Sequence, residues 1–151
     1  MILGALEKRV PPPLLLVALM ALAWFAGGPG FDFPARVPAG IVLMAAGLGL
    51  KIVAALAFRA RGTTVSPLAP ERSAALVVDG LYRFTRNPMY LGAVTILIGW
   101  TLYLGAWPAV LAVPVYVQYL NRFQIGPEER ALSALFGADY DAYRARVRRW
   151  I

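Results

Sequence analysis

The chain has 151 residues, of which 60% are hydrophobic and 15% charged, and its formal net charge is +7. This composition is more apolar than that of a soluble domain of similar size and is typical of a membrane domain. It contains no cysteine, which excludes disulfides and thiolate chemistry, and no histidine, the commonest general base and metal ligand. We therefore expect no metal site. The basic residues flank apolar stretches, so anionic lipid headgroups, and not nucleic acid, are the expected partner.

Four apolar segments have about the length that crosses a bilayer. They cover about residues 13–28, 37–58, 90–107 and 108–123. The last two are separated only by the turn-like stretch Gly105–Pro108, which predicts a tight antiparallel hairpin, and Pro114 is expected to kink the fourth. The sequence thus predicts an all-α, polytopic membrane protein with about four transmembrane helices, forming a single domain over residues 1–151.

The first segment has a second interpretation. Lys8 and Arg9 precede a short apolar run, as in a secretory signal. The prolines Pro11–Pro13 and the lack of a small-residue cleavage site favour a retained helix.

The distribution of Lys and Arg predicts the orientation. These residues gather before the first segment, between the second and third, and after the fourth, whereas the first connection holds only Arg36. The positive-inside rule therefore places both termini and the long connection in the cytoplasm. We assign the aromatic residues near segment ends to the membrane interfaces: Trp24, Trp100, Tyr103, Trp107 and Tyr116.

Lys51 is a formal charge well inside the second segment. An ionisable residue at that depth is a candidate functional group, but a side chain that snorkels to the interface is the interpretation we favour. The nearby small residues Ala45, Gly47 and Gly49 predict a surface for close helix packing.

After the fourth segment, Gly126-Pro127 is expected to break the helix and start a new one. Glu128 and Glu129 would complement the positive end of its dipole. Gly137 is a predicted stop, and Asp139 a predicted cap for a final helix along the membrane surface.

Polar residues concentrate in residues 74–92 and 124–143, on either side of the predicted hairpin. Because a hairpin returns the chain to the side from which it started, the two blocks can build one site on the cytoplasmic face. Taken singly, their arginines, glutamates and tyrosines also fit simple roles at headgroups and helix ends.

The first block contains GLYRFTRNPMYLG and the second EERALSALFGADYDAYRARV. These motifs resemble the signatures of the isoprenylcysteine carboxyl methyltransferase and phospholipid methyltransferase superfamily, in the right order and with a hairpin between them. The resemblance covers about residue 67 to the C-terminus. It implies an S-adenosylmethionine-dependent methyltransferase, with S-adenosylhomocysteine as product, whose acceptor is lipid-like, such as an isoprenylcysteine carboxylate or a phospholipid amine.

The resemblance and the chemistry of the side chains together predict the cofactor-binding residues. These are Ala74, Ala75, Leu76, Val77, Tyr82, Arg86, Asn87, Pro88, Met89, Tyr90 and Glu128. Glu128 can accept hydrogen bonds from the cofactor's ammonium, and Arg86 or Asn87 can meet its carboxylate. Tyr82 and Tyr90 offer aromatic faces to adenine or the sulfonium.

Three further residues bear on the acceptor. Eukaryotic prenylcysteine enzymes carry an arginine four residues before the first glutamate, where this chain has Gln124, which cannot form a charged fork. Arg122 could replace it if the helix end turns that side chain inward. A carboxylate acceptor needs no base, whereas for an amine or thiol the candidate bases are Glu129, Glu128 or a tyrosine.

Two other functions fit the composition: a non-catalytic membrane scaffold or partner subunit that retains the fold, and a small transporter. Lys51 and the small residues around it are the features that favour transport, but no second charge within the apolar segments completes a pathway. For the methyltransferase, we expect the acceptor's lipid end to enter sideways from the bilayer, and a second copy of the chain could complete its tunnel.

Overall fold

A computed structural model describes residues 10–62 and 75–151, and this part of the chain is all-α. The long helices are α1 (Pro12–Ala26), α2 (Arg36–Ala60) and α3 (Pro88–Leu104). A second group follows in the order α4 (Trp107–Val110), α5 (Ala112–Tyr119), the π-helical stretch η4 (Leu120–Ile125), α6 (Gly126–Phe136) and α7 (Ala138–Arg146). A 3-10 turn, η3 (Gly80–Arg83), precedes α3. The predicted helical segments are therefore present, with ends shifted by up to about three residues.

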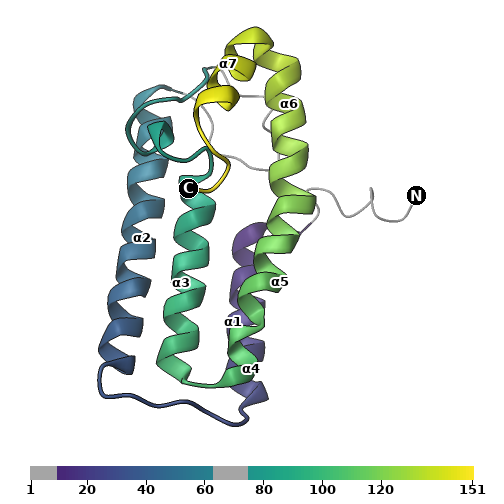
Figure 1. Ribbon diagram of the computed structural model, residues 1–151. Coiled ribbons are helices and arrows are strands. Elements are labelled where there is room, and N and C mark those ends of the chain that lie inside the picture. Colours follow the sequence, from purple (N-terminus) through teal and green to yellow (C-terminus); the bar gives the residue numbers. More distant parts are fainter. Residues whose placement is uncertain (1–9, 63–74) are drawn as a thin grey trace, which may run out of the picture.

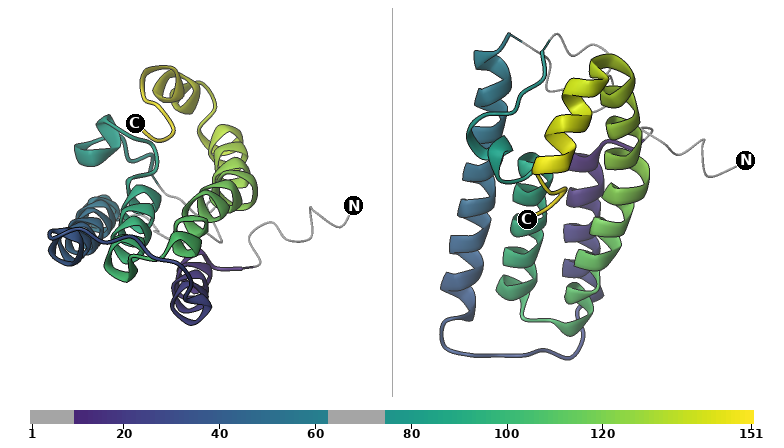
Figure 2. Two further views of the ribbon diagram at one scale, coloured as in Figure 1. Left: turned by 60° about the horizontal axis from the view of Figure 1, so that its bottom comes forward. Right: turned by 45° about the horizontal axis from the view of Figure 1, so that its top comes forward.

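The helices stand side by side as a bundle (Figures 1 and 2). The connection from α1 to α2 and the turn from α3 to α4 lie at one end, which we call the turn end. The end of α2, the start of α3, α6, α7 and the C-terminus lie at the opposite end, which we call the site end. The two predicted polar blocks thus meet at one end of the bundle, as the hairpin implied.

Glycines allow α2 and α3 to pack with their backbones in contact. A Cβ atom on Gly47 would lie 2.5 Å from the carbonyl oxygen of Gly92, and one on Gly40 would lie 2.7 Å from that of Gly99. The predicted packing surface is confirmed at Gly47 but is wrong at Gly49, where an added Cβ meets nothing within 4 Å. Glycines seven residues apart return to nearly the same helix face, whereas Gly49 is turned away from it. Ala45 is also exposed.

Arg36 closes the turn end. Its guanidinium donates hydrogen bonds to the carbonyl oxygens of Leu102, at 3.0 Å, and Tyr103, and it also binds Asp32. These carbonyls belong to the last turn of α3, where the negative end of the helix dipole attracts a cation. Gly105, with φ of 65°, then turns the chain toward α4.

The predicted break at Gly126-Pro127 is wrong. Leu120, Ile125 and Gly126 all have right-handed helical dihedral angles, and α5, η4 and α6 form one continuous rod (Figure 1). Proline has no amide hydrogen, and its ring would clash with the carbonyl four residues earlier in an α-helix; the wider π turn relieves that clash. The interruption that does occur, between α4 and α5, precedes Pro114 by one turn, close to where a kink was predicted.

The core lies between α1, α3, α5 and η4, around Leu97, Leu120 and Ile125. Tyr116 belongs to it: the side chain is fully buried and donates to the carbonyl of Pro12 at 3.1 Å, so its assignment to a membrane interface is wrong. Trp24 and Trp100 stack with ring centroids 5.8 Å apart.

Helix α2 is long and apolar enough to cross a membrane, with a mean hydropathy of 2.3 over its most apolar stretch. Helices α1 and α3 are apolar but shorter. Large apolar side chains of α2 face outward, among them Ile41, Val42, Ile52 and Val53. Such an outer face suits a hydrocarbon surrounding better than water.

At the end of α6, Gly137 has φ of 51° and stops the helix as predicted. Asp139 does not cap α7 as expected, because the helix begins one residue earlier and Asp139 lies in its first turn.

Candidate functional site

The approach to α3 is held by the C-terminal segment 147–151. The hydroxyl of Thr85 donates to the carbonyl of Arg149 at 3.2 Å, and the side-chain amide of Asn87 donates to the same oxygen at 2.9 Å. The backbone amide of Arg86 donates to the carbonyl of Arg148 at 3.0 Å. The Asn87 amide, predicted to meet a cofactor carboxylate, is thus already engaged in holding the chain end against the start of α3.

Glu129 joins these segments through charge. It accepts hydrogen bonds from Arg86 at 2.8 Å and from Arg149 at 3.1 and 2.6 Å, with 12% of its side chain exposed. Glu128 and Glu129 both lie in the first turn of α6, as predicted, but η4 runs directly into α6 and leaves no free amino end for them to complement. With both oxygens bound by guanidinium groups, Glu129 anchors the site end and is poorly placed to accept a substrate proton.

Glu128 faces α3. The hydroxyl of Tyr90 donates a short hydrogen bond to it, which fixes the carboxylate beside the first turn of α3. Glu128 and Glu129, although adjacent in sequence, therefore have different partners.

A cavity of about 280 Å³ opens between α2, α3, α6 and α7, close to the lower end of the range for small-molecule sites. It is lined by Pro12, Pro13, Lys51, Phe58, Ala75, Leu76, Val77, Tyr82, Arg86, Asn87, Met89, Tyr90, Ala93, Tyr116, Glu128, Glu129, Leu132, Tyr140 and Tyr143. Its walls are mainly apolar and aromatic, with few charged groups, which is the usual make-up of a pocket for an organic ligand.

The tyrosines of the site end stay protonated at neutral pH. Burial raises the pKa of Tyr82, and Tyr143 and Glu128 raise it further. Burial, followed by the charge of Glu129, raises the pKa of Tyr140 to about 12, and burial also raises that of Tyr143. Neutral phenols donate hydrogen bonds and offer aromatic faces, and the hydroxyl of Tyr143 does donate to the carbonyl of Tyr82 at 2.7 Å. None of the three is poised to act as a base.

The cavity brings together nine of the eleven residues predicted to bind the cofactor. They are Ala75, Leu76, Val77, Tyr82, Arg86, Asn87, Met89, Tyr90 and Glu128. Pro88 is buried at the start of α3 outside the lining, and Ala74 lies outside the described residues.

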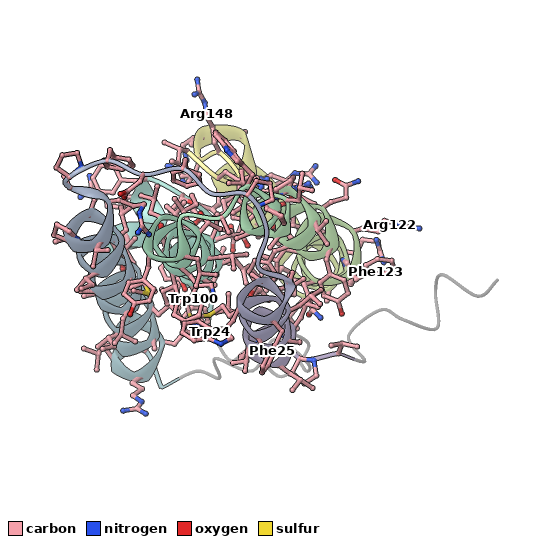
Figure 3. The ribbon with its side chains drawn as sticks, turned by 90° about the horizontal axis from the view of Figure 1, so that it is seen from below. Trp24, Phe25, Trp100, Arg122, Phe123 and Arg148 are labelled. Carbon is pink, nitrogen blue, oxygen red and sulfur yellow. The ribbon has the colours of Figure 1, made fainter. Side chains whose placement is uncertain are left out.

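Gln124 and Arg122 lie away from the cavity. Gln124 is fully buried and its amide donates to the carbonyl of Val10 at 3.0 Å, so it holds the start of α1. Arg122 does not turn inward: its side chain is exposed on the outer face of the rod, beside Phe123 (Figure 3). The predicted substitution of Arg122 for a substrate-binding arginine is therefore not supported by this arrangement.

Several lining residues were not predicted individually. Tyr140 and Tyr143 stand in the quoted second motif, where their spacing of three residues on a helix was a usable signal. Phe58 comes from α2 and packs edge-on against Tyr82, with centroids 5.3 Å apart. Lys51 also lines the cavity.

The described cavity offers complementary groups for an amino-acid moiety. Glu128 presents a carboxylate, and the Nε atom of Arg86 is buried without a hydrogen-bond partner in the described structure. Arg86 lines the same cavity, and its guanidinium can meet an anionic oxygen there. The aromatic wall of Tyr82, Tyr140 and Tyr143 fits the remainder of a nucleoside-bearing ligand.

The helices form an apolar bundle with a polar site at one end. Such an arrangement can hold a polar ligand next to an apolar one. Residues 35–139 match the family described as phospholipid methyltransferase, and the chain belongs to that family. The family comprises membrane-bound methyltransferases that use S-adenosylmethionine.

Two relatives overlap this region. An uncharacterized protein of Haemophilus influenzae is 44% identical over 63 residues, which are 42% of this chain and all of that protein. The protein-S-isoprenylcysteine O-methyltransferase of Schizosaccharomyces pombe is 32% identical over 72 residues, which are 48% of this chain but only 30% of the yeast enzyme. No solved structure matches the chain.

Proposed function

We propose that this protein transfers a methyl group from S-adenosylmethionine to a lipid-like or small apolar acceptor at the cytoplasmic face of a membrane. The observation that carries the proposal is the cavity at the site end, where Glu128 and Arg86 line the same space. These two groups are complementary to the ammonium and carboxylate of the cofactor's methionine part. Family membership supports the same activity.

Bound S-adenosylmethionine supplies an electrophilic methyl group on a positively charged sulfur. The contribution of this chain is to orient the reactants and exclude water. Glu128, held by Tyr90, fixes one end of the cofactor, while Tyr82, Tyr140 and Tyr143 provide neutral aromatic walls whose faces favour a cation.

The acceptor determines whether a proton must leave. A carboxylate is nucleophilic without a base, and this chemistry fits a cavity whose described tyrosines remain protonated. An amine needs to lose a proton, and Glu129, whose oxygens bind two arginines, is poorly placed to take it.

The excess of Lys and Arg at the site end supports a cytoplasmic orientation. Residues of α1 and α2, including Pro13 and Phe58, line the cavity, and both helices expose apolar side chains on their outer faces. An apolar acceptor can therefore approach between helices from the hydrocarbon region.

Calorimetric titration of the detergent-purified protein with S-adenosylhomocysteine tests the proposal. We expect saturable binding, weakened about tenfold or more by Glu128→Gln, because a hydrogen bond to a charged group is lost. Asp32→Asn, at the turn end, is the matched control and should bind as the wild type does. A folded wild-type protein that binds no S-adenosylhomocysteine would refute the enzyme function and favour the scaffold.

A further inference from the structure

Lys51 extends toward the cavity across a gap left by a glycine. A Cβ atom on Gly92 would lie 2.8 Å from Cγ of Lys51, so the absence of a side chain there makes room for the lysine stem. Gly92 lies in the first turns of α3, between the lining residues Met89 and Ala93. The lysine therefore enters the site from α2, opposite α6 and its glutamates.

Lys51 lies well inside α2 and not at its end. Lys51 precedes the end of α2 at Ala60 by two and a half turns, about 14 Å along the helix axis. A lysine side chain reaches only about 6 Å, so its ammonium cannot arrive at that end of the helix. A charge held in apolar surroundings at this depth requires a partner or a ligand.

Among the described residues that line the cavity, Lys51 and Arg86 are the cationic ones. Arg86 is bound to Glu129 through Nη2 and lies among the polar groups of the site end. The position at which prenylcysteine enzymes carry a substrate-binding arginine is here occupied by Gln124, which is turned toward Val10. Lys51 is thus the cation that remains on the apolar side of the cavity.

Its neighbours in the cavity indicate which reactant it meets. Polar groups suited to the cofactor, Glu128 and Arg86, come from α6 and the approach to α3, whereas Lys51 comes from α2. The other lining residue from α2, Phe58, is apolar. An ammonium on this side of the cavity can hold the acceptor's head without competing for the cofactor's methionine carboxylate.

We propose that Lys51 binds an anionic oxygen group on the methyl acceptor, so that the acceptor is an apolar molecule with a carboxylate or phosphate head. The inference rests on the proposed function, because it assumes that the cofactor occupies the polar side of the same cavity. Lys51 acts here as a substrate-binding residue that favours acceptors with a negatively charged head. An anionic head next to an ammonium in an apolar wall gains far more than it would in water.

The test uses two pairs of amphiphiles that differ in head charge. Farnesylthioacetate is compared with its amide, and farnesyl phosphate with farnesol, by calorimetric titration of the detergent-solubilised protein saturated with S-adenosylhomocysteine. We expect the anionic member of at least one pair to bind about tenfold more tightly or better. Preference within the first pair identifies a carboxylate acceptor, and preference within the second pair alone identifies a phosphate-bearing one.

Variants of Lys51 then test whether this residue causes the preference for an anionic head. Lys51→Met keeps the length of the side chain and should abolish the discrimination, while Lys51→Arg should retain most of it. Arg59→Met removes an exposed cation from the same helix and should leave discrimination intact. Affinity for S-adenosylhomocysteine should stay within about twofold of the wild type in all three.

Two results would overturn the inference: no charge preference in the wild type, or a preference that survives Lys51→Met. A fall in S-adenosylhomocysteine affinity in Lys51→Met would instead assign the ammonium to the cofactor, which also refutes it. Failure of the wild type to bind S-adenosylhomocysteine at all is a separate outcome that refutes the proposed function.

Discussion

The two ends of the bundle each hold an arginine in a largely buried position, but they use it differently. At the turn end, Arg36 meets the last carbonyls of α3, and its carboxylate partner Asp32 is 87% exposed. At the site end, Arg86 is held by Glu129, itself 12% exposed, and keeps one buried donor that no described residue pairs. The first arrangement satisfies the local backbone, whereas the second leaves binding capacity beside a cavity.

This difference separates structural polar residues from functional ones without reference to motifs. A buried polar group with all its partners present stabilises the fold, and one with a partner missing next to a cavity indicates a ligand. By this criterion, Asn87 and Glu129 belong mainly to the structure, while Arg86 belongs to the site.

Removing the two carboxylates provides the largest contrast. Glu129→Ala leaves Arg86 and Arg149 facing each other without their shared anion, and we expect a loss of about 3–5 kcal/mol in the free energy of unfolding. Asp32→Ala removes an exposed partner and should cost at most about 1 kcal/mol. Denaturant unfolding in detergent measures both values. Equal losses would show that the two ends are not distinguished by how their ion pairs are buried.

The close packing of α2 on α3 predicts a smaller effect. Gly47→Ala places a methyl group against the backbone of Gly92 and should destabilise the protein by about 1–3 kcal/mol. Gly49→Ala is the matched control, because its methyl group meets open space, and its stability should be unchanged or slightly higher. Thermal unfolding of both variants compares them directly. If Gly47→Ala were as stable as Gly49→Ala, the backbone contact between the helices would be disproved.

Alkaline pH should destabilise the site end through its buried phenols. The phenol of Tyr140 keeps its proton in the fold up to about pH 12, whereas in the unfolded chain it ionises near pH 10. Its contribution to stability is therefore complete below pH 10 and is lost between about pH 10 and 12. Tyr140→Phe should show a shallower fall in melting temperature over this interval. A fall as steep as that of the wild type would contradict the assignment.

The sequence predicted the helical segments and both blocks of the site because these depend on local properties. Hydropathy summed over a whole segment locates a helix, and the motifs around Asn87 and Glu128 identify a family through residue type and spacing alone. The bounds of α1, α2 and α3 differ from the prediction by at most about three residues.

The missed features depend on how each helix is rotated about its axis. Lys51 reaches the cavity because Gly47 and Gly92 fix the facing sides of α2 and α3, and no local pattern reports that rotation. Tyr116 was assigned to an interface from its position along the chain, but its phenol is directed at the start of α1. The directions of the Gln124 and Arg122 side chains were predicted as if the α-helix continued. In the structure α5 ends at Tyr119, and a π-helical stretch follows.

The π-helical stretch between Tyr119 and Gly126 also determines the direction in which the side chains after it point. Each α-helical residue turns the chain by about 100°, so a single extra residue within one turn redirects every side chain that follows. On one side of this stretch Tyr116 faces α1, and on the other Glu128 faces α3. The number of residues in η4 thus determines the direction of the side chains of α6. Adding or deleting one residue would leave α6 intact as a helix but point its glutamates away from Tyr90 and Arg86.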